Sequence, residues 1–422
     1  MWNGIIVVSL QKIVDNTNNV NMGNRSFYIS TDRQGSDFSN EAEVHVNLIR
    51  NYPKNRKGHK NANLCIDFGL GLKPHTDAYN IYFYAPFYIP KKVHGKPEGI
   101  VDLGKILVSN RETVSAVFNE NIDVRQVESS PSFYALHIGG KESARKVLYV
   151  LDSTSFEFIP LDVDEKGTLI KITIPKLDNW PPADTNTGGE QPSDEHEAKG
   201  NGKPDLYIRF RIITSKKNGV RSLQQSERLY NNVIKGAFEI TDLFDIRIND
   251  VRVSETKVLE KMCNGNQSSL LQFNKVHFFY ITDVKEIVAA RSSSLNDVRM
   301  LEDDTWSVYL NGIEDEKMRI AYHWKSTKNS QGTNTNPMKE YCVFFSSDNK
   351  DFDILQLTRY CLMVILLGFL GSLLVEVVKK TDSCNLIGIV SIIGVISIIC
   401  FSNVIIKKAH CLCRWFCSRK KK

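Results

Sequence analysis

Residues 206–212 have the sequence Leu-Tyr-Ile-Arg-Phe-Arg-Ile, in which purely apolar side chains alternate with longer, polar-tipped ones. Successive side chains of a β-strand point to opposite faces of a sheet. The alternation therefore puts the apolar side chains on one face and Tyr207, Arg209 and Arg211 on the other. This pattern predicts a half-buried β-strand.

The same period of two recurs on both sides of this strand. Residues 78–89 are dense in aromatic and β-branched side chains, which favour strands. Further strands are predicted at residues 133–138, 147–151, 169–174, 238–248, 276–281 and 343–345. Residues 306–310 lead into Asn311-Gly312, a turn signal, and then to the alternating residues 318–325, which predicts a hairpin.

Two helices are predicted among the strands. Residues 102–119 place six apolar side chains on one helical face, with Asp102 as the N-cap. Ser222 and Gln225 form a capping box for a second helix, which is expected to end near Gly236.

The strands are mostly not separated by helices, which favours antiparallel sheets. We therefore predict a β-rich α+β fold: one or two mainly antiparallel β domains, followed by a C-terminal two-helix transmembrane hairpin. The first β-rich domain is assigned to residues 1–180, and a second domain or half-domain to residues 205–352. Between them, residues 181–204 hold four prolines, four glycines and only two apolar residues, which predicts a flexible linker or disordered loop.

The hairpin is predicted from two hydrophobic segments, residues 360–378 and 386–406, which are nineteen and twenty-one residues long. An α-helix rises about 1.5 Å per residue, so each segment reaches about 30 Å, the thickness of the hydrocarbon core of a bilayer. Seven residues separate the segments, so the two transmembrane helices are expected to run antiparallel. The alternative is a buried helical hairpin inside a soluble domain.

The orientation follows from the distribution of basic residues. Residues 407–422 carry seven lysines and arginines, whereas the loop between the two segments carries two. Because basic segments stay on the cytoplasmic side, we predict an integral membrane protein with two spans and with both termini in the cytoplasm. The whole chain has a net charge of +6, so the rest of it has a net charge of −1, and no nucleic-acid partner is expected.

The basic tail, residues 407–422, is predicted to contact a lipid bilayer with anionic headgroups. The residues assigned to this contact are Lys407, Lys408, Arg414, Arg419, Lys420, Lys421 and Lys422. The same tail contains Cys411, Cys413 and Cys417, which are candidates for lipidation. Thiols without a special role are the alternative, and the cysteine spacing disfavours a zinc site.

Small residues punctuate both hydrophobic segments, and they let the backbones of helices approach closely in lipid. The residues predicted to pack helices in this way are Gly368, Gly371, Ser372, Gly388, Ser391, Gly394 and Ser397. This pattern predicts homo-oligomerisation through the hairpin, with packing inside one chain as the alternative.

No motif points to catalysis. Asp67-Phe68-Gly69 matches a kinase triplet, but the other kinase motifs do not accompany it. The sequence thus predicts no catalytic, cofactor-binding or metal-binding residues and no cofactor, and it favours a non-enzymatic role. We expect a membrane-anchored protein whose cytosolic β-rich region binds or senses a protein or small-molecule ligand. The alternatives are a membrane effector whose hairpin oligomerises to permeabilise the bilayer on ligand binding, and a membrane-surface enzyme whose site no motif reveals.

Overall fold

The computed structural model describes most of residues 26–350 and ten residues further on. Between 26 and 350 the undescribed residues are 33–40, 52–62, 75–77, 91–98, 129, 140, 142, 162–166, 182–202, 215–222, 228–238, 254–255, 263–267, 292–294, 311–317 and 328–336. The residues described further on are Thr358, Cys361, Leu362, Val364, Ile365, Gly368, Phe369, Gly371, Ser372 and Glu376.

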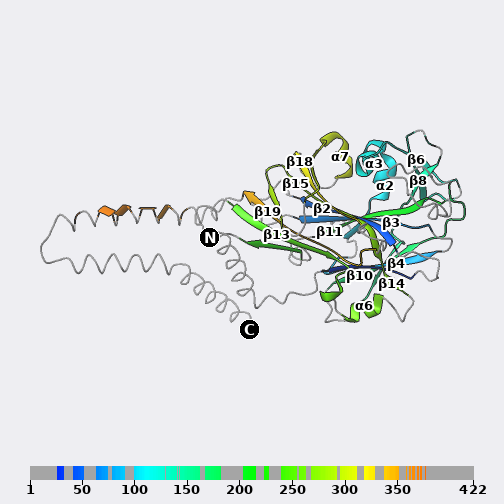
Figure 1. Cartoon of the computed structure of the whole chain (residues 1–422), viewed down its shortest axis with the longest axis horizontal. Coiled ribbons are helices and arrows are strands. Elements are labelled where there is room, and N and C mark those ends of the chain that lie inside the picture. Colours follow the sequence, from blue (N-terminus) through cyan, green and yellow to red (C-terminus); the bar gives the residue numbers. More distant parts are fainter. Residues whose placement is uncertain are drawn as a thin grey trace, which may run out of the picture. The chain divides into compact units, whose positions relative to one another are not determined.

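The described strands form two mixed sheets (Figure 1). Sheet 1 has the order β16 (Ile287–Ala290), β19 (Tyr341–Lys350), β13 (Glu239–Ile248), β1 (Ser26–Thr31), β4 (Tyr79–Ala85), β10 (Thr168–Ile174), β9 (Phe156–Ile159), with β12 (Gln224–Glu227) beside β13 and β14 (Ser269–Leu270) beside β1. Sheet 2 has the order β17 (Asp297–Leu301), β18 (Arg319–Thr327), β15 (Gln272–Asp283), β2 (Glu41–Asn51), β3 (Asn63–Leu72), β11 (Asp205–Thr214), β8 (Ala144–Tyr149), β7 (Phe133–Ile138), β6 (Ile122–Gln126), with β5 (Gly99–Asp102) beside β11.

The predicted β-rich class is confirmed, and the sheets are mixed. Three pairs are parallel, namely β1 with β13, β2 with β15, and β8 with β11. The other strand pairs whose register is described are antiparallel, such as β2 with β3 and β3 with β11. Strands from before and after residues 181–204 are neighbours in both sheets, and they belong to one compact unit.

The main core lies between the two sheets and is built by strand alternation. The inward-facing residues of β2, for example, are Ala42, Val44, Val46 and Leu48, all fully buried. Aromatic rings join the sheets: the Phe68 ring of sheet 2 lies 4.7 Å from the Phe83 ring of sheet 1. Such edge-to-face pairs bury large apolar areas and hold the two layers in register.

Helices cover the outer faces of the sheets. On sheet 2, α2 (Gly104–Ser109), α3 (Arg111–Phe118) and α7 (Asp303–Tyr309) share a second core with outward-facing residues such as Ile49 and Ile281. On sheet 1, α6 (Thr256–Met262) packs Val258 against Tyr28 and its neighbours. Figure 1 shows α2, α3 and α7 along one side of this unit and α6 along the other. A short 3₁₀ turn, η3 (Val251–Val253), follows β13.

The single helix predicted for residues 102–119 is two helices. Asn110 has an extended backbone (φ −139°, ψ 109°), and its side chain accepts a hydrogen bond from the Thr113 amide at the start of α3. The N-cap of α2 is Leu103, not Asp102 as predicted; Asp102 precedes it, and its carboxylate accepts hydrogen bonds from the Gly104 and Lys105 amides. The helix breaks at Asn110 because its side chain, in an extended backbone conformation, accepts a hydrogen bond from an amide that would otherwise have no partner at the start of α3. Asparagine is favoured at such a cap and disfavoured inside a helix.

Two other predicted elements are wrong. Residues 306–310 belong mostly to α7, where Trp306 and Tyr309 lie one turn apart and are both buried, while acidic residues in the first turn suit the helix dipole. The predicted helix that starts at Ser222 is replaced, in the part that the structure describes, by β12, which pairs with β13. The pairing of β12 with β13 outweighs the helix-capping pattern of the local sequence.

Part of the first predicted span is described. Its described residues from Cys361 to Glu376 are helical, and Leu362, Val364, Ile365 and Phe369 are 49–66% exposed. Among the residues that the structure describes, none of the helices has the length and apolar character needed to cross a bilayer. Residues 386–406, the tail 407–422 and most of the predicted linker, residues 182–202, lie outside the described residues.

Candidate functional site

A row of polar side chains projects from the outer face of sheet 2. On β2, Glu43, His45 and Asn47 alternate with the buried core residues, so all three face outward. The parallel pairing with β15 sets Lys275 beside Glu43 and His277 beside His45. The sheet register therefore collects titratable groups that are far apart in sequence.

Two glycines on the neighbouring strand make room for this cluster. Gly69 and Gly71 of β3 pair with His45 and Glu43, respectively. A Cβ at Gly69 would lie only 2.8 Å from Cζ of Tyr207, because side chains of β11 lie across the glycine. The Tyr207 hydroxyl thereby reaches Nδ1 of His45, at 3.3 Å.

Strand β11, which was predicted to be half-buried, is buried on both faces. Arg209 and Arg211 of β11 are 2% and 3% exposed. Arg211 forms a two-point ion pair with Asp67, with nitrogen–oxygen distances of 2.6 and 3.0 Å. The Tyr309 hydroxyl of α7 donates to Asp67 at 2.6 Å and accepts from Nε of Arg209 at 2.8 Å. The helix layer thus closes over the polar face of the strand.

Arg209 differs from Arg211 in its partners. Its guanidinium donates to the hydroxyls of Tyr309 and Tyr207, the latter at 2.7 Å. Within the described ranges, Arg209 makes no ion pair with a carboxylate. Its direct hydrogen-bond partners are neutral, and the nearby carboxylate of Asp67 is already paired with Arg211, so Arg209 attracts an anion that can approach it.

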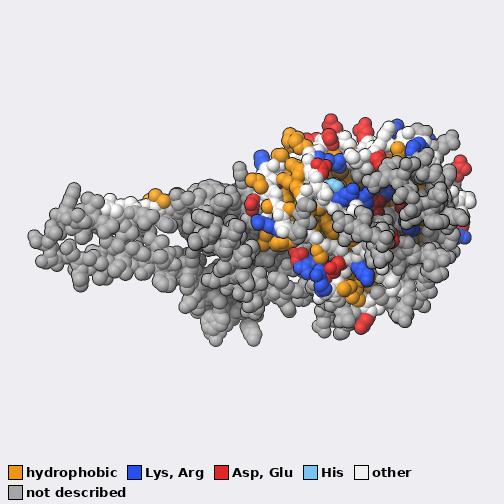
Figure 2. Space-filling view, in the orientation of Figure 1, with side chains coloured by type: hydrophobic (Ala, Val, Ile, Leu, Met, Phe, Trp, Pro, Cys, Tyr) orange, Lys and Arg blue, Asp and Glu red, His pale blue; other side chains and the backbone are white. Residues whose placement is uncertain are grey.

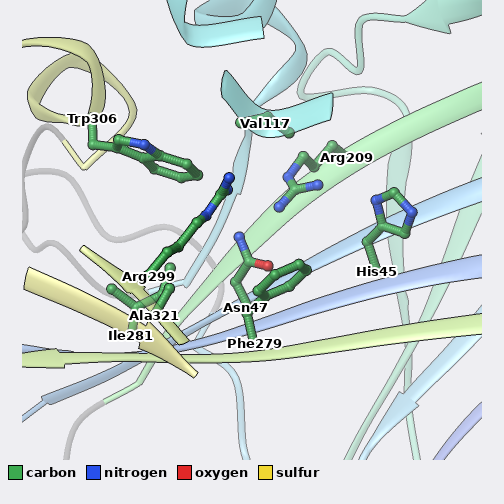
Figure 3. A pocket seen from close by; sticks show the side chains of 9 residues that line it. All are labelled: His45, Asn47, Val117, Arg209, Phe279, Ile281, Arg299, Trp306 and Ala321. Carbon is green, nitrogen blue, oxygen red and sulfur yellow. The ribbon is translucent and has the colours of Figure 1, made fainter. Parts of the chain in front are cut away.

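A small cavity lies beside this arginine, between sheet 2 and the helices. It has an empty volume of about 330 Å³, including the part that opens to solvent. It is lined by His45, Asn47, Val117, Arg209, Phe279, Ile281, Arg299, Trp306 and Ala321. Figure 3 shows Arg209, Arg299 and Asn47 directing their nitrogen-bearing ends toward the same space.

Arg299 is the second guanidinium of the cavity. It donates to Asn119 at 3.3 Å, and its guanidinium lies 5.7 Å from the centre of the Trp306 ring. Its Nε atom is buried and has no hydrogen-bond partner in the described part of the chain. The cavity therefore contains a charged donor that is not satisfied.

Among the outward-facing residues Glu43, His45 and Asn47 of β2, Glu43 lies farthest along the strand from Asn47, and cationic side chains surround it. Nζ of Lys146 is 2.5 Å from its Oε2 atom, and Nζ of Lys275 is 3.8 Å from its Oε1 atom. Burial opposes ionisation of Glu43, but the close contact with His45 and the charge of Lys146 outweigh it and hold the pKa well below the usual range. Glu43 is thus ionised and its charge is shared.

The histidines of the row are neutral at pH 7. Burial lowers the pKa of His45 to about 4, although the contact with Glu43 opposes the shift. Burial and the nearby His45 and Lys275 lower the pKa of His277 to about 3. Nδ1 of His277 lies 3.0 Å from Nε2 of His323 on β18, with the two rings stacked. A neutral imidazole has one N–H and one nitrogen lone pair, so His45 and His277 can each accept a hydrogen bond or bind a metal ion through one nitrogen.

Basic side chains gather on one area of this face. Figure 2 shows lysine and arginine side chains gathered beside a histidine, in the area below α7 in Figure 1. No family model and no curated protein matches the sequence.

Of the residues predicted from the sequence to pack helices, contact lipid or carry lipidation, the structure describes three. Gly368, Gly371 and Ser372 are helical, the Ser372 hydroxyl donates to the Gly368 carbonyl at 3.1 Å, and a Cβ at either glycine would meet open space. The other assigned positions lie outside the described residues: Gly388, Ser391, Gly394, Ser397, Lys407, Lys408, Cys411, Cys413, Arg414, Cys417, Arg419, Lys420, Lys421 and Lys422.

The polar residues on the outer face of sheet 2 were not predicted from the sequence. One local signal was present, since Glu43, His45 and Asn47 occupy every second position of an otherwise apolar strand. No local signal linked them to His277, because only the β2–β15 pairing brings the two histidines together.

Proposed function

We propose that this chain is a membrane-anchored binding protein whose β-rich body takes a small anionic ligand in the cavity of sheet 2. The observation that carries the proposal is the pair of guanidinium groups on one cavity, Arg209 and Arg299, neither of which forms an ion pair among the described residues. An anion between them would compensate both charges and satisfy the buried Nε of Arg299.

The electrostatic surroundings support an anion. Two carboxylates beside residues of the cavity lining already have partners, Asp67 with Arg211 and Glu43 with Lys146. Asn47 contributes an amide to the lining, and its Nδ2 donates to the Tyr309 hydroxyl at 3.4 Å, so it is held in place. The donors placed around the cavity suit a compact oxyanion, such as a phosphate.

The membrane anchor is the second part of the proposal. We place two spans at residues 360–378 and 386–406, both termini in the cytoplasm, and the basic tail on anionic headgroups. The exposure of Leu362, Ile365 and Phe369 on described helical residues supports an apolar environment for the first span, since large apolar side chains are stable where lipid or protein covers them.

The anchor is tested by expressing the full chain and washing isolated membranes with alkaline carbonate, which removes peripheral proteins. The protein is expected to stay in the pellet and to be released by detergent. Release of the chain by carbonate alone, as a monodisperse species, refutes the anchor.

The ligand is tested by isothermal titration of the detergent-solubilised full chain with inorganic phosphate and pyrophosphate. We expect saturable one-to-one binding, weakened at least tenfold by Arg299→Gln and largely kept by Arg299→Lys. Arg252→Gln is the matched control, because Arg252 is an exposed arginine that pairs with Asp250 at the end of β13. Equal affinities in all four proteins rule out the cavity as the site, and hydrolysis of pyrophosphate favours the membrane-surface enzyme instead.

A further inference from the structure

We infer that Glu43, His45 and His277 form a binding site for a divalent transition-metal ion, with zinc as the best fit. This inference is independent of the anionic ligand, because it rests on different atoms. One ligand atom from each of the three side chains lies within 4.8 Å of the others. Two imidazoles and one carboxylate are a recurrent zinc donor set.

The distances match those of a coordination sphere. Nε2 of His45 lies 3.2 Å, and Nε2 of His277 lies 3.7 Å, from the same oxygen, Oε1 of Glu43. Zinc binds nitrogen and oxygen at about 2.0–2.2 Å, so tetrahedral ligand atoms lie about 3.4 Å from each other. The two observed distances bracket this value, and the three ligand atoms all lie within 4.8 Å of one another.

The far nitrogen of each ring has a partner that orients it. Nδ1 of His45 lies 3.3 Å from the Tyr207 hydroxyl, and Nδ1 of His277 lies 3.0 Å from Nε2 of His323. When each Nδ1 carries the proton and donates it, the lone pair of each Nε2 points toward Glu43. Ligating histidines are commonly held by such a hydrogen bond on the other nitrogen.

The near nitrogen of His45 lacks a proper hydrogen bond. Its Nε2 is buried, and although Glu43 lies close to it, no hydrogen bond of acceptable geometry is formed within the described residues. With the proton of each ring on Nδ1, two imidazole lone pairs and a carboxylate oxygen face one another, and they repel unless a cation lies between them. A metal ion resolves this conflict.

The lysines define how Glu43 would bind. Lys146 pairs with Oε2, and the half-exposed Lys275 lies 3.8 Å from Oε1, so an ion would bind Oε1 alone and would displace the more distant ammonium of Lys275. Three protein ligands leave a fourth position for water or a ligand atom. His45 also lines the arginine cavity, so an ion bound here lies beside that cavity.

The test uses cobalt as a spectroscopic probe. The full chain in detergent, stripped with a chelator, is titrated with Co²⁺ and followed by visible absorption. Because the tail contains three cysteines, the titration is done in a background with Cys411→Ser, Cys413→Ser and Cys417→Ser. We expect one equivalent to bind with the intense visible bands of four-coordinate cobalt, and zinc to displace it.

Two ligand variants and one control locate the ion. Glu43→Gln and His277→Gln are each expected to weaken cobalt binding at least tenfold, whereas His196→Gln, in the polar segment 181–204, leaves it unchanged. Circular dichroism without metal confirms that each variant is folded. Lys146→Met removes the competing ammonium group and is expected to strengthen binding, which keeps the test decisive if a ligand variant unfolds. Absence of stoichiometric binding in the parent and in Lys146→Met overturns the inference, as does unchanged binding in folded Glu43→Gln and His277→Gln.

Discussion

Gly69→Ala tests whether the open backbone of β3 builds the polar site. The added Cβ would lie 2.8 Å from Cζ of Tyr207 and 3.1 Å from Nη1 of Arg209, so the buried tyrosine has to move. Gly71→Ala is the matched control on the same strand: its closest neighbour is Cβ of Glu43 at 3.3 Å, which can give way slightly.

The expected magnitude follows from what the displaced ring loses. Overpacking a filled interior costs about 1–3 kcal/mol. Losing the hydrogen bond from the Arg209 guanidinium to the Tyr207 hydroxyl adds about 1.5–3 kcal/mol, because the donor is charged and buried. Both alanines gain about 0.5–1 kcal/mol from the stiffer backbone. We therefore expect Gly69→Ala to lower the free energy of unfolding by about 2–5 kcal/mol and Gly71→Ala to change it by less than about 1 kcal/mol.

The assay is urea unfolding of the full chain in mild detergent, followed by the circular dichroism of the β-sheets. Gly69→Ala is also expected to weaken phosphate binding, since Tyr207 holds Arg209 at the cavity. In a Tyr207→Phe background the cost of Gly69→Ala is expected to shrink, because the hydroxyl group is gone. Equal unfolding midpoints for the two glycine variants refute this account of β3.

Three further predictions use the same assay. Asp67→Asn removes the carboxylate that pairs with the buried guanidinium of Arg211 and is expected to lower the free energy of unfolding by about 3–5 kcal/mol. Asp178→Asn, at an exposed pair, is the control and is expected to lower it by less than about 1 kcal/mol. Similar losses for both variants count against the buried pair. Tyr309→Phe removes the hydroxyl shared by an arginine and a carboxylate and is expected to cost about 1.5–3 kcal/mol; a neutral effect argues against that bridge. The pKa values of His45 and His277 are lowered to about 4 and about 3 in the folded chain, so the unfolded chain binds more protons below about pH 6.5. The free energy of unfolding is therefore expected to fall as the pH drops from about 7 to about 5, and to fall less steeply in His277→Gln. A flat pH profile contradicts the neutral histidines.

Much of the fold was predictable because burial imposes a period of two. β7 covers the predicted residues 133–138, and β10 and β13 begin within a residue of their predicted starts. The error at α7 has a physical origin: Trp306, Tyr309 and Leu310 are spaced one turn apart, but a short apolar run before Asn-Gly also fits a strand. Short segments carry too few residues for periodicity to decide between the two.

The site was beyond local sequence reasoning. His45 and His277 are separated by 232 positions and become neighbours only through a parallel strand pairing. The burial of Arg209 was equally hidden, because alternation says which side chains share a face but not whether a helix layer covers it. The ligand environment therefore depends on tertiary contacts that composition and spacing do not encode.

The central claim is that the two arginines of the cavity hold an anion. The most direct measurement is a crystal structure of the full chain soaked with tungstate, an oxyanion that anomalous scattering locates without ambiguity. The account predicts a peak within hydrogen-bonding distance of the guanidinium groups of Arg209 and Arg299. Tungstate found only on exposed surface lysines, with the cavity filled by water at the same soak concentration, would contradict it.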